Sequence, residues 1–277
     1  MPFLVEPEPE RGTALPLLPG IRRIVAPNPG PMTYHGTNTY LIAGREGLIV
    51  LDPGPDSPEH VDAIMRAASS PVSLILLSHT HIDHVGAVAA LGAASGAPAA
   101  GFAQSGFTSF EPEIKLREGD IIHGVTALHT PGHAADHLCF ALRAENGVRA
   151  LFSGDHVMSW SSSIISPPDG NVQSYLASLE RLLGRHDDLY LPGHGPPLPE
   201  PRDLVREILN HRRERERTIL SALAEGGRTI PALVDRVYSV DHPILRRAAE
   251  RNVLAHLQKL SAEGRVVEIG EVWRACT

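Results

Sequence analysis

The stretch Ser78-His79-Thr80-His81-Ile82-Asp83-His84 places three imidazoles and a carboxylate within a few residues, directly after an apolar run at residues 72–77. A short run rich in Val, Ile and Leu predicts a buried strand, so the cluster is expected where a strand ends. Zinc takes imidazole nitrogen and carboxylate oxygen as ligands, and imidazole also suits iron. His79 and His81 alternate in an extended loop and are predicted to share one ion, while Asp83 and His84 reach a second.

Three further loops carry a histidine or an aspartate directly after a glycine. They are His129-Thr130-Pro131-Gly132-His133, Ser153-Gly154-Asp155-His156 and Pro192-Gly193-His194-Gly195. The glycine lets the backbone turn tightly and brings the next side chain close to an ion. A lone histidine in such a loop is more often structural, but the clustered set favours metal binding. His133, Asp155 and His194 are therefore candidate ligands, in loops along one edge of a sheet scaffold.

Short apolar runs with the length of strands recur through the first 200 residues, and helical patterns fall between them. Strands are predicted at residues 39–42, 48–51, 72–77, 125–128, 138–142, 148–152 and 189–191. Helices are predicted at residues 60–68, 85–91 and 172–183. Strands that alternate with helices predict an α/β layered architecture.

The chain changes character near residue 200. Residues 1–200 hold 11 Lys and Arg against 21 Asp and Glu, whereas residues 201–277 hold 14 against 11. The Pro-rich stretch 192–201 marks the change and predicts a junction between a catalytic domain (1–200) and a C-terminal domain (201–277). Helices at 202–225, 230–238 and 243–262, the last capped by Asp241, precede a hairpin at 266–273. This order predicts a winged-helix-like module or a simpler packing appendage.

Composition excludes several classes of protein. With 42% hydrophobic and 21% charged residues, the chain is typical of a globular protein with a packed core. It lacks an apolar run of about 18 residues, and its acidic, Pro-rich residues 1–16 do not resemble an export signal, so no membrane association is predicted. Its two cysteines lie far apart, and Cys139 sits in an apolar run. Free thiols and a cytoplasmic location are expected; the oligomeric state is not predicted.

The cluster and the loops that follow it resemble a known family. Residues 79–84 match the signature HxHxDH of the metallo-β-lactamase superfamily, and the Gly-His, Gly-Asp and Gly-His loops follow in the family's order. The resemblance implies an αββα sandwich and a metal-dependent hydrolase with two divalent ions, zinc first, with iron or manganese as alternatives. It assigns His79, His81 and His133 to the first metal, Asp83, His84 and His194 to the second, and Asp155 to a bridge between them. Asp52 and His137 match positions expected to orient ligands.

Other segments narrow the resemblance to lactamase-beta-like proteins with a C-terminal winged helix, a group that includes an endoribonuclease. The shared segments include Asn28-Pro29-Gly30-Pro31-Met32-Thr33, Gly36-Thr37-Asn38-Thr39-Tyr40-Leu41 and Pro192-Gly193-His194-Gly195-Pro196, together with the tail helices. This resemblance implies a small C-terminal winged-helix domain. It also favours single-stranded RNA as the substrate, and a small acyl substrate is the alternative.

The implied chemistry needs no serine or cysteine nucleophile. Two cations that share a water lower its pKa toward about 7, which makes a metal-bridging hydroxide that attacks an acyl carbon or a phosphorus. By resemblance, Asp83 is both a ligand and the catalytic residue that steers the nucleophile's proton. The segment 159–170 is long enough to form a pocket wall. Trp160 and Ser161, with Tyr34 and His35 from an earlier loop, are candidate substrate-binding residues, and anchoring of the surface loops is the alternative role.

Three functions compete at this point. Cleavage of single-stranded RNA is favoured by the subgroup and by a tail rich in arginine, although the acidic first domain opposes a phosphate backbone. An esterase, thioesterase or lactonase with hydroxyacylglutathione-hydrolase-like chemistry needs no basic surface. A nucleic-acid-binding protein with a vestigial metal site is the third, and the complete ligand set disfavours it. The tail arginines are Arg212, Arg213, Arg215, Arg217, Arg246, Arg247 and Arg251.

Overall fold

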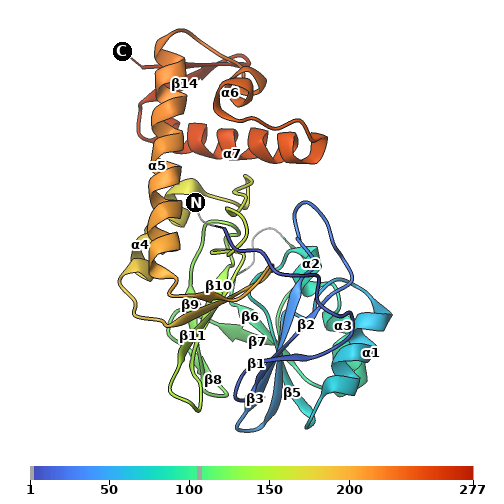
Figure 1. Ribbon diagram of the computed structural model, residues 1–277. Coiled ribbons are helices and arrows are strands. Elements are labelled where there is room, and N and C mark those ends of the chain that lie inside the picture. Colours follow the sequence, from blue (N-terminus) through green and yellow to red (C-terminus); the bar gives the residue numbers. More distant parts are fainter. Residues whose placement is uncertain (1–2, 105–107, 277) are drawn as a thin grey trace.

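Two β-sheets pack face to face between outer helices, and a smaller helical unit follows them in the chain (Figure 1). The computed structural model describes residues 3–104 and 108–276. The αββα sandwich that the resemblance implied is confirmed, and the smaller unit has the helices and the two-stranded hairpin expected of a winged helix.

The first sheet has its strands in sequence order. They are β1 (Leu15–Leu18), β2 (Ile21–Val25), β3 (Asn38–Gly44), β4 (Gly47–Leu51), β5 (Val72–Leu76), β6 (Ala99–Phe102) and β7 (Ile114–Leu116). The apolar runs correctly predicted β3, β4 and β5. They did not predict the other four strands, which are short and less apolar. Strand β1 contains Pro, β2 contains Arg, β6 contains Ala and Gly, and β7 contains Lys.

The second sheet has the order β13-β12-β11-β10-β9-β8. Its strands are β8 (Ile121–Ile122), β9 (Val125–His129), β10 (Leu138–Arg143), β11 (Arg149–Gly154), β12 (Leu189–Pro192) and β13 (Leu198–Pro199). The runs predicted the four central strands, and missed only β8 and β13, which have two residues each. Strands β11 and β12 are parallel, so the loops that carry Asp155 and His194 leave the same edge.

Alternation along the strands divides the core into layers. Tyr40 and Ile42 of β3 pack between the two sheets, whereas Leu41 packs under the outer helices of the first sheet. Phe140 of β10 likewise faces the centre, and Cys139 faces the helices of the second sheet. Side chains alternate between the two faces of a strand, and in this fold both faces of each sheet are covered. Apolar side chains are therefore needed at every position, which explains why these strands are continuous apolar runs.

The outer helices are α1 (Pro58–Ala67), α2 (Ile82–Val85) and α3 (Val88–Ser95) on the first sheet, with α4 (Val172–Leu183) and α5 (Arg202–Ala224) on the second. The prediction of a single helix at residues 85–91 is wrong in its bounds. The chain forms two helices there because the Ala87 amide donates to the Gly54 carbonyl at 2.9 Å, outside any helical ladder. The short α2 thereby holds Asp83 and His84 at the strand edge.

The C-terminal unit contains α6 (Ile230–Val237), α7 (Pro243–Ala262) and the hairpin β14 (Val266–Ile269) and β15 (Val272–Ala275). It has its own core around Leu257 and Trp273. Asp241 is not the cap of α7: His242 is, with its Nδ1 accepting the Ile244 amide at 3.3 Å. Pro243 opens the helix, so the residue directly before it takes the cap position.

Helix α5 links the two units (Figure 1). Its first half packs Leu204 and Ile208 against the second sheet and α4, and its second half packs Ile219 and Leu223 into the C-terminal core. The domain division at residue 200 stays a prediction, because α5 contributes to the cores of both units.

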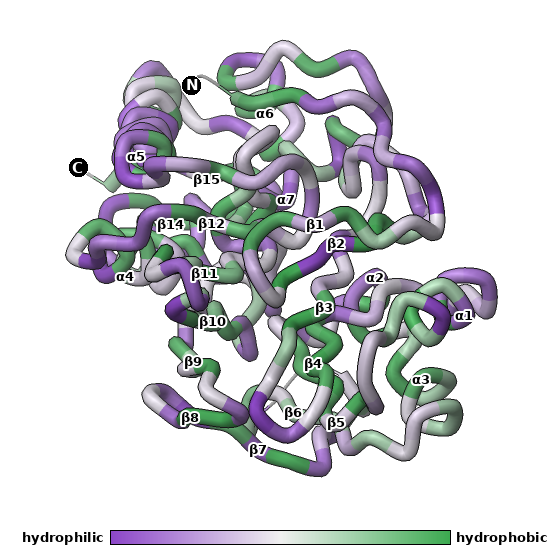
Figure 2. Tube along the Cα trace, turned by 60° about the horizontal axis from the view of Figure 1, so that its bottom comes forward, coloured by the Kyte–Doolittle hydropathy of each residue, from purple (hydrophilic) through white to green (hydrophobic). Residues whose placement is uncertain are grey.

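Figure 2 shows hydrophobic residues along β3 and β4 of the first sheet, whereas the linking helix α5 is largely hydrophilic. Within residues 3–104 and 108–276, no helix combines the length and the apolar character that a membrane span requires. Cys139 and Cys276 are both free, as the sequence predicted.

Candidate metal centre

The seven predicted ligands meet at one edge of the sandwich. His79 and His81 follow β5, Asp83 and His84 lie in α2, His133 follows β9, Asp155 follows β11 and His194 follows β12. Loops that are remote in sequence therefore converge because the strands that carry them end at the same edge.

The first group is three imidazoles whose nitrogens face a common point. His79 Nε2 lies 3.0 Å from His81 Nδ1, and His133 Nε2 lies 2.9 Å from the same atom. Ligand atoms that bind one zinc ion at about 2.1 Å are about 3.0–3.5 Å apart. The spacing of these nitrogens is therefore that of ligands to a single ion.

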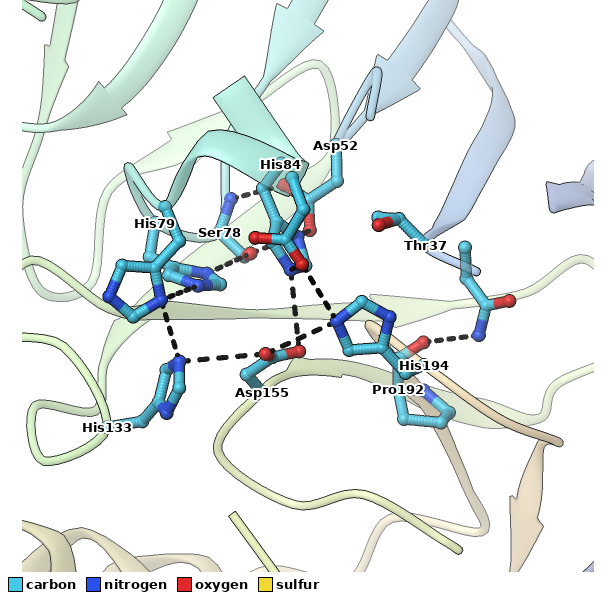
Figure 3. A network of polar contacts seen from close by, with 12 residues as sticks. Thr37, Asp52, Ser78, His79, His84, His133, Asp155, Pro192 and His194 are labelled. Carbon is cyan, nitrogen blue, oxygen red and sulfur yellow. Dashed lines mark hydrogen bonds and ion pairs between the residues drawn. The ribbon is translucent and has the colours of Figure 1, made fainter. Parts of the chain in front are cut away.

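The second group combines a carboxylate with two imidazoles. Asp83 Oδ2 lies 3.3 Å from His194 Nε2 and 3.7 Å from His84 Nε2. Asp155 stands between the groups: Oδ2 is 3.6 Å from His133 Nε2 and 3.4 Å from His194 Nε2. Figure 3 shows this carboxylate with His133 on one side and His84 and His194 on the other, as a bridging ligand requires.

The donor atoms fit divalent ions. His84 Nε2, Asp155 Oδ1 and His194 Nε2 are buried and have no hydrogen-bond partner among the described residues. Leaving a buried polar atom unpaired costs about 1–3 kcal/mol. Because all three atoms face the same space, a cation there satisfies them together. His/Asp clusters of this kind are thus suited to metal binding.

Charge differs between the two groups. Burial lowers the pKa of His133 to about 4 and that of His79 well below its usual range, so both rings are neutral and offer a lone pair. Burial also opposes charge on His84 and His194, but the surrounding carboxylates outweigh it and raise both pKa values, that of His194 to about 9. Although burial opposes ionisation of Asp155, the neighbouring His194 and His84 keep its pKa well below the usual range. Positive charge is therefore favoured in the second group, from protons or from a cation.

Asp52 contacts both the start of the ligand cluster and one of the candidate ligands. Its carboxylate accepts the Ser78 amide at 2.7 Å and the Ser78 hydroxyl at 2.6 Å, and Oδ2 also accepts His84 Nδ1–H at 3.0 Å. This contact leaves His84 Nε2 free to face the ligand group. Asp52 adopts a φ of 51°, which is rare for a residue with a side chain, and these three contacts hold it there.

His137 positions Asp155 through the backbone. Burial keeps the pKa of His137 well below its usual range, so the ring is neutral. Its Nε2 accepts the Asp155 amide at 3.1 Å, and its Nδ1–H donates to Thr130 Oγ1 at 2.9 Å. Gly154 leaves room for the ring, because a Cβ there would lie 2.5 Å from His137 Nε2.

Each candidate imidazole ligand has its second nitrogen held by a fixed acceptor, which sets the tautomer and the ring orientation. The acceptors are Ser78 Oγ for His79 (3.0 Å), Asp169 Oδ2 for His81 (3.3 Å), Asp52 Oδ2 for His84 (3.0 Å), the Ile164 carbonyl for His133 (2.7 Å) and the Gly36 carbonyl for His194 (3.2 Å). Sequence reasoning missed Asp169. It lies in the segment expected to wall the pocket, and only its Pro-Pro-Asp-Gly context marks it as a turn residue.

Replacing Asp169 by alanine is expected to weaken metal binding about 10- to 100-fold, because His81 loses the partner that orients it. Competition with a chromogenic chelator measures this affinity. Asp169→Asn is the matched variant. In the wild type, the backbone N–H of Ala135 donates to Asp169 Oδ1 at 2.7 Å, and the side-chain oxygen of asparagine can still accept this bond. An alanine variant with wild-type metal affinity contradicts the orienting role.

A pocket of about 410 Å³ opens over the two groups, here named the metal pocket. His81, Asp83, His133 and Asp155 form its floor. Its walls come from Met32, Met158, Ile164 and Ser166 of the first domain and from Ile244, Arg247, Ala248 and Arg251 of α7. The C-terminal domain thus contributes directly to the space above the candidate ligands.

The four predicted substrate residues lie beside this pocket, and none lines it. The Tyr34 hydroxyl and His35 Nε2 both contact the backbone of Glu6, at 3.0 and 3.1 Å, so they hold the N-terminal segment. Trp160 packs on Tyr34 with ring centroids 5.0 Å apart. Trp160 and Ser161 line a second, adjoining cavity. A substrate role for these residues stays a prediction.

The comparisons with known proteins agree with this geometry. Residues 32–194 match the family model of the metallo-beta-lactamase superfamily, a range that includes all seven candidate ligands. The chain belongs to the metallo-β-lactamase superfamily. Residues 229–273 match the beta-lactamase associated winged helix domain, which covers α6, α7 and the hairpin. This superfamily member is therefore a metal-dependent hydrolase, as the sequence predicted.

Similar proteins span nearly the whole chain. The beta-lactamase-like protein 2 homolog of Drosophila melanogaster is 30% identical and covers 90% of each chain. The atrochrysone carboxyl ACP thioesterase of Passalora fulva is 30% identical over 93% of this chain and 80% of its own length. A beta-lactamase domain protein from Burkholderia ambifaria has the same fold, with 24% identity, a TM-score of 0.79 and coverage of 97% and 95%.

Proposed function

We propose that this metallo-β-lactamase superfamily member hydrolyses acyl thioesters, or closely related acyl esters, of small molecules, with two divalent ions held by the seven side chains of the metal centre. The observation that carries the proposal is the character of the metal pocket. Met32, Met158, Ile164 and Ile244 give it an apolar side directly above the ligand groups. Apolar walls with a few convergent polar groups are typical of sites for small organic substrates.

The divalent ions, when bound, supply an activated water and polarise the substrate carbonyl. Asp83 lines the pocket floor and is the most exposed carboxylate of the ligand set, with 26% of its side chain accessible. Although burial opposes ionisation, the neighbouring His84 and His194 lower its pKa below the usual range, so it stays ionised. A fixed carboxylate at this position accepts a hydrogen bond from the attacking water and orients it toward the carbonyl carbon.

The tail arginines that favoured RNA cleavage are largely occupied within the chain. Arg212 donates to Asn252 and Ser162, Arg213 pairs with Glu180, Arg215 donates to the Val237 carbonyl, Arg217 pairs with Glu214, Arg246 pairs with Asp235 and Arg251 donates to Ser166. In the described part of the chain only Arg247, among these seven, makes no hydrogen bond or ion pair. A surface for a phosphate backbone needs several available cations, so the arrangement favours an acyl substrate.

Arg247 suits the thiol part of a thioester. It is exposed on α7 and lines the wall of the metal pocket, as does Ile244 of the same helix. A guanidinium at a pocket wall binds carboxylate or phosphate groups in a fixed geometry. The name of the Passalora fulva relative, an acyl carrier protein thioesterase, supports the same substrate class.

A parallel activity assay tests the proposal. Metal-loaded protein is given acyl thioesters of N-acetylcysteamine, the matching oxygen esters and lactones, and a single-stranded RNA oligonucleotide. We expect thioester hydrolysis that falls at least about 100-fold after chelation, because the activated water is lost, and intact RNA. RNA cleavage with no hydrolysis of any acyl substrate replaces the proposal with the phosphodiesterase hypothesis.

A further inference from the structure

A second cavity adjoins the metal pocket and has a volume of about 170 Å³. We name it the side cavity. Trp160 and Ser161 line it from the first domain, and Tyr238, Val240 and Leu245 from the C-terminal domain. Met32, Met158, Ile164 and Ala248 line both spaces, so the two adjoin.

The serine and asparagine side chains that line the side cavity are already paired within the chain. Ser162 Oγ accepts Arg212 Nη2 at 2.9 Å, and the Ser161 hydroxyl donates to the Ser162 carbonyl at 3.2 Å. Asn252 Oδ1 accepts from Arg212 and from the Ile165 amide, both at 3.0 Å. The Asn252 amide nitrogen donates to the Ala248 carbonyl at 3.2 Å. The indole Nε1–H of Trp160 is buried and has no hydrogen-bond partner among the described residues, so the surface left for a ligand is mainly apolar, with one available donor.

We infer that the side cavity receives the far end of the substrate's acyl chain, and that the substrate is a linear acyl group of medium length. This inference rests on the proposed function, which places the acyl carbonyl over the metal centre. A flexible alkyl chain passes from one space to the other by way of their shared wall. Ala248 has the smallest side chain of the four shared residues, so on this inference the alkyl chain crosses beside it.

Burial of alkyl groups predicts a measurable effect of acyl-chain length on kcat/KM. Each methylene that moves from water into an apolar cavity gains about fourfold in kcat/KM. For wild-type protein we expect kcat/KM to rise from butanoyl to decanoyl thioesters by at least about 100-fold in total. A substrate bound only in the metal pocket has no reason to show this rise.

Two substitutions test the path of the chain. Ala248→Phe fills the passage, and Ser161→Phe fills the side cavity from a loop, so a folding defect in one leaves the other informative. In each, the decanoyl-to-butanoyl ratio of kcat/KM is expected to fall from about 100 or more to below about 5. Ala262→Phe makes the same change at an exposed position of α7 and is expected to keep the wild-type ratio.

A binding measurement provides a readout that does not depend on turnover. Decanoate is titrated into the metal-free protein while the fluorescence of Trp160 is followed in a Trp273→Phe background. Trp160 lines the side cavity, whereas Trp273 lies in the C-terminal core. We expect a saturable fluorescence change that is lost in Ala248→Phe and retained in Ala262→Phe.

The outcomes separate the inference from the proposed function. Thioesters hydrolysed at the same kcat/KM for every chain length, with Ala248→Phe unchanged in its ratio, overturn the inference and leave the function standing. No hydrolysis of any thioester, together with decanoate binding that Ala248→Phe abolishes, rejects the proposed function and supports the cavity as an alkyl site. Absence of decanoate binding to wild-type protein also overturns the inference.

Discussion

Replacing Asp83 by alanine is expected to lower kcat on an acyl thioester by about 10³-fold and to reduce the bound metal from about two equivalents to about one. Apart from the bridging Asp155, Asp83 is the only carboxylate of the second group. Its Oδ2 lies 3.3 Å from His194 Nε2. Without it, His84 and His194 remain as two imidazoles that do not balance a divalent charge. Steady-state kinetics and elemental analysis of the purified protein measure the two effects.

The control for Asp83 is Asp203→Ala, which removes an aspartate that is 88% exposed and paired only with Arg206 on the surface of α5. Its activity and metal content are expected to equal those of wild type. Asp83→Asn keeps the shape of the side chain but not its charge, and it is expected to behave like the alanine variant. Full metal content and full activity in both Asp83 variants contradict a role for this carboxylate as ligand and proton guide.

Much of the metal centre was predictable from the sequence because its chemistry is concentrated in short segments. Residues 79–84 supply four of the seven candidate ligands in one loop and one turn of helix, and the rest follow glycines at strand ends. The central strands were predictable for a related reason. They are covered on both faces, so each is an uninterrupted apolar run.

The walls of the pocket were not predictable, because they depend on how the two domains pack. Nothing in the pattern of α7 distinguishes Ile244 and Ala248, which line the metal pocket, from the apolar residues that fill the core of the C-terminal unit. Asp169 is similar, since no spacing rule connects it with His81. Such contacts arise between segments far apart in the chain, and a single sequence does not encode them as a local pattern.

The arginine run of α5 shows the same limit in one segment. The charged run 212–217 was interpreted either as an RNA-binding surface or as a solvated helix face with internal ion pairs. The second interpretation holds for Arg217, which pairs with Glu214 of the same helix, whereas Arg213 pairs with Glu180 of α4. It is wrong for Arg212, a residue that is only 3% exposed. The helical position of Arg212 faces α7 and the loop over the metal centre, which the sequence of α5 alone does not reveal.

Arg212 is the centre of a buried network that joins three segments. Its guanidinium donates to Asn252 Oδ1 of α7 at 3.0 Å, to Ser162 Oγ at 2.9 Å and to the Ser163 carbonyl, and it lies 5.3 Å from the centre of the Tyr175 ring. The loop held in this way continues to the Ile164 carbonyl, which accepts His133 Nδ1–H at 2.7 Å. Packing between the domains therefore reaches a candidate metal ligand through two consecutive peptide units.

Replacing Arg212 by alanine is expected to lower the free energy of unfolding by about 3 kcal/mol, because it opens a cavity, leaves the Ser163 carbonyl without its donor and removes one of the two donors to Asn252 Oδ1. Chemical denaturation of the metal-free protein measures this loss.

Arg213→Ala is the matched control on the next residue of α5. Its ion pair with Glu180 is exposed, with 52% and 53% of the two side chains accessible, so it is expected to change stability by less than about 0.5 kcal/mol. If the network also positions His133, Arg212→Ala weakens metal binding relative to Arg213→Ala. Equal stability and equal metal affinity in the two variants contradict this coupling between the domains.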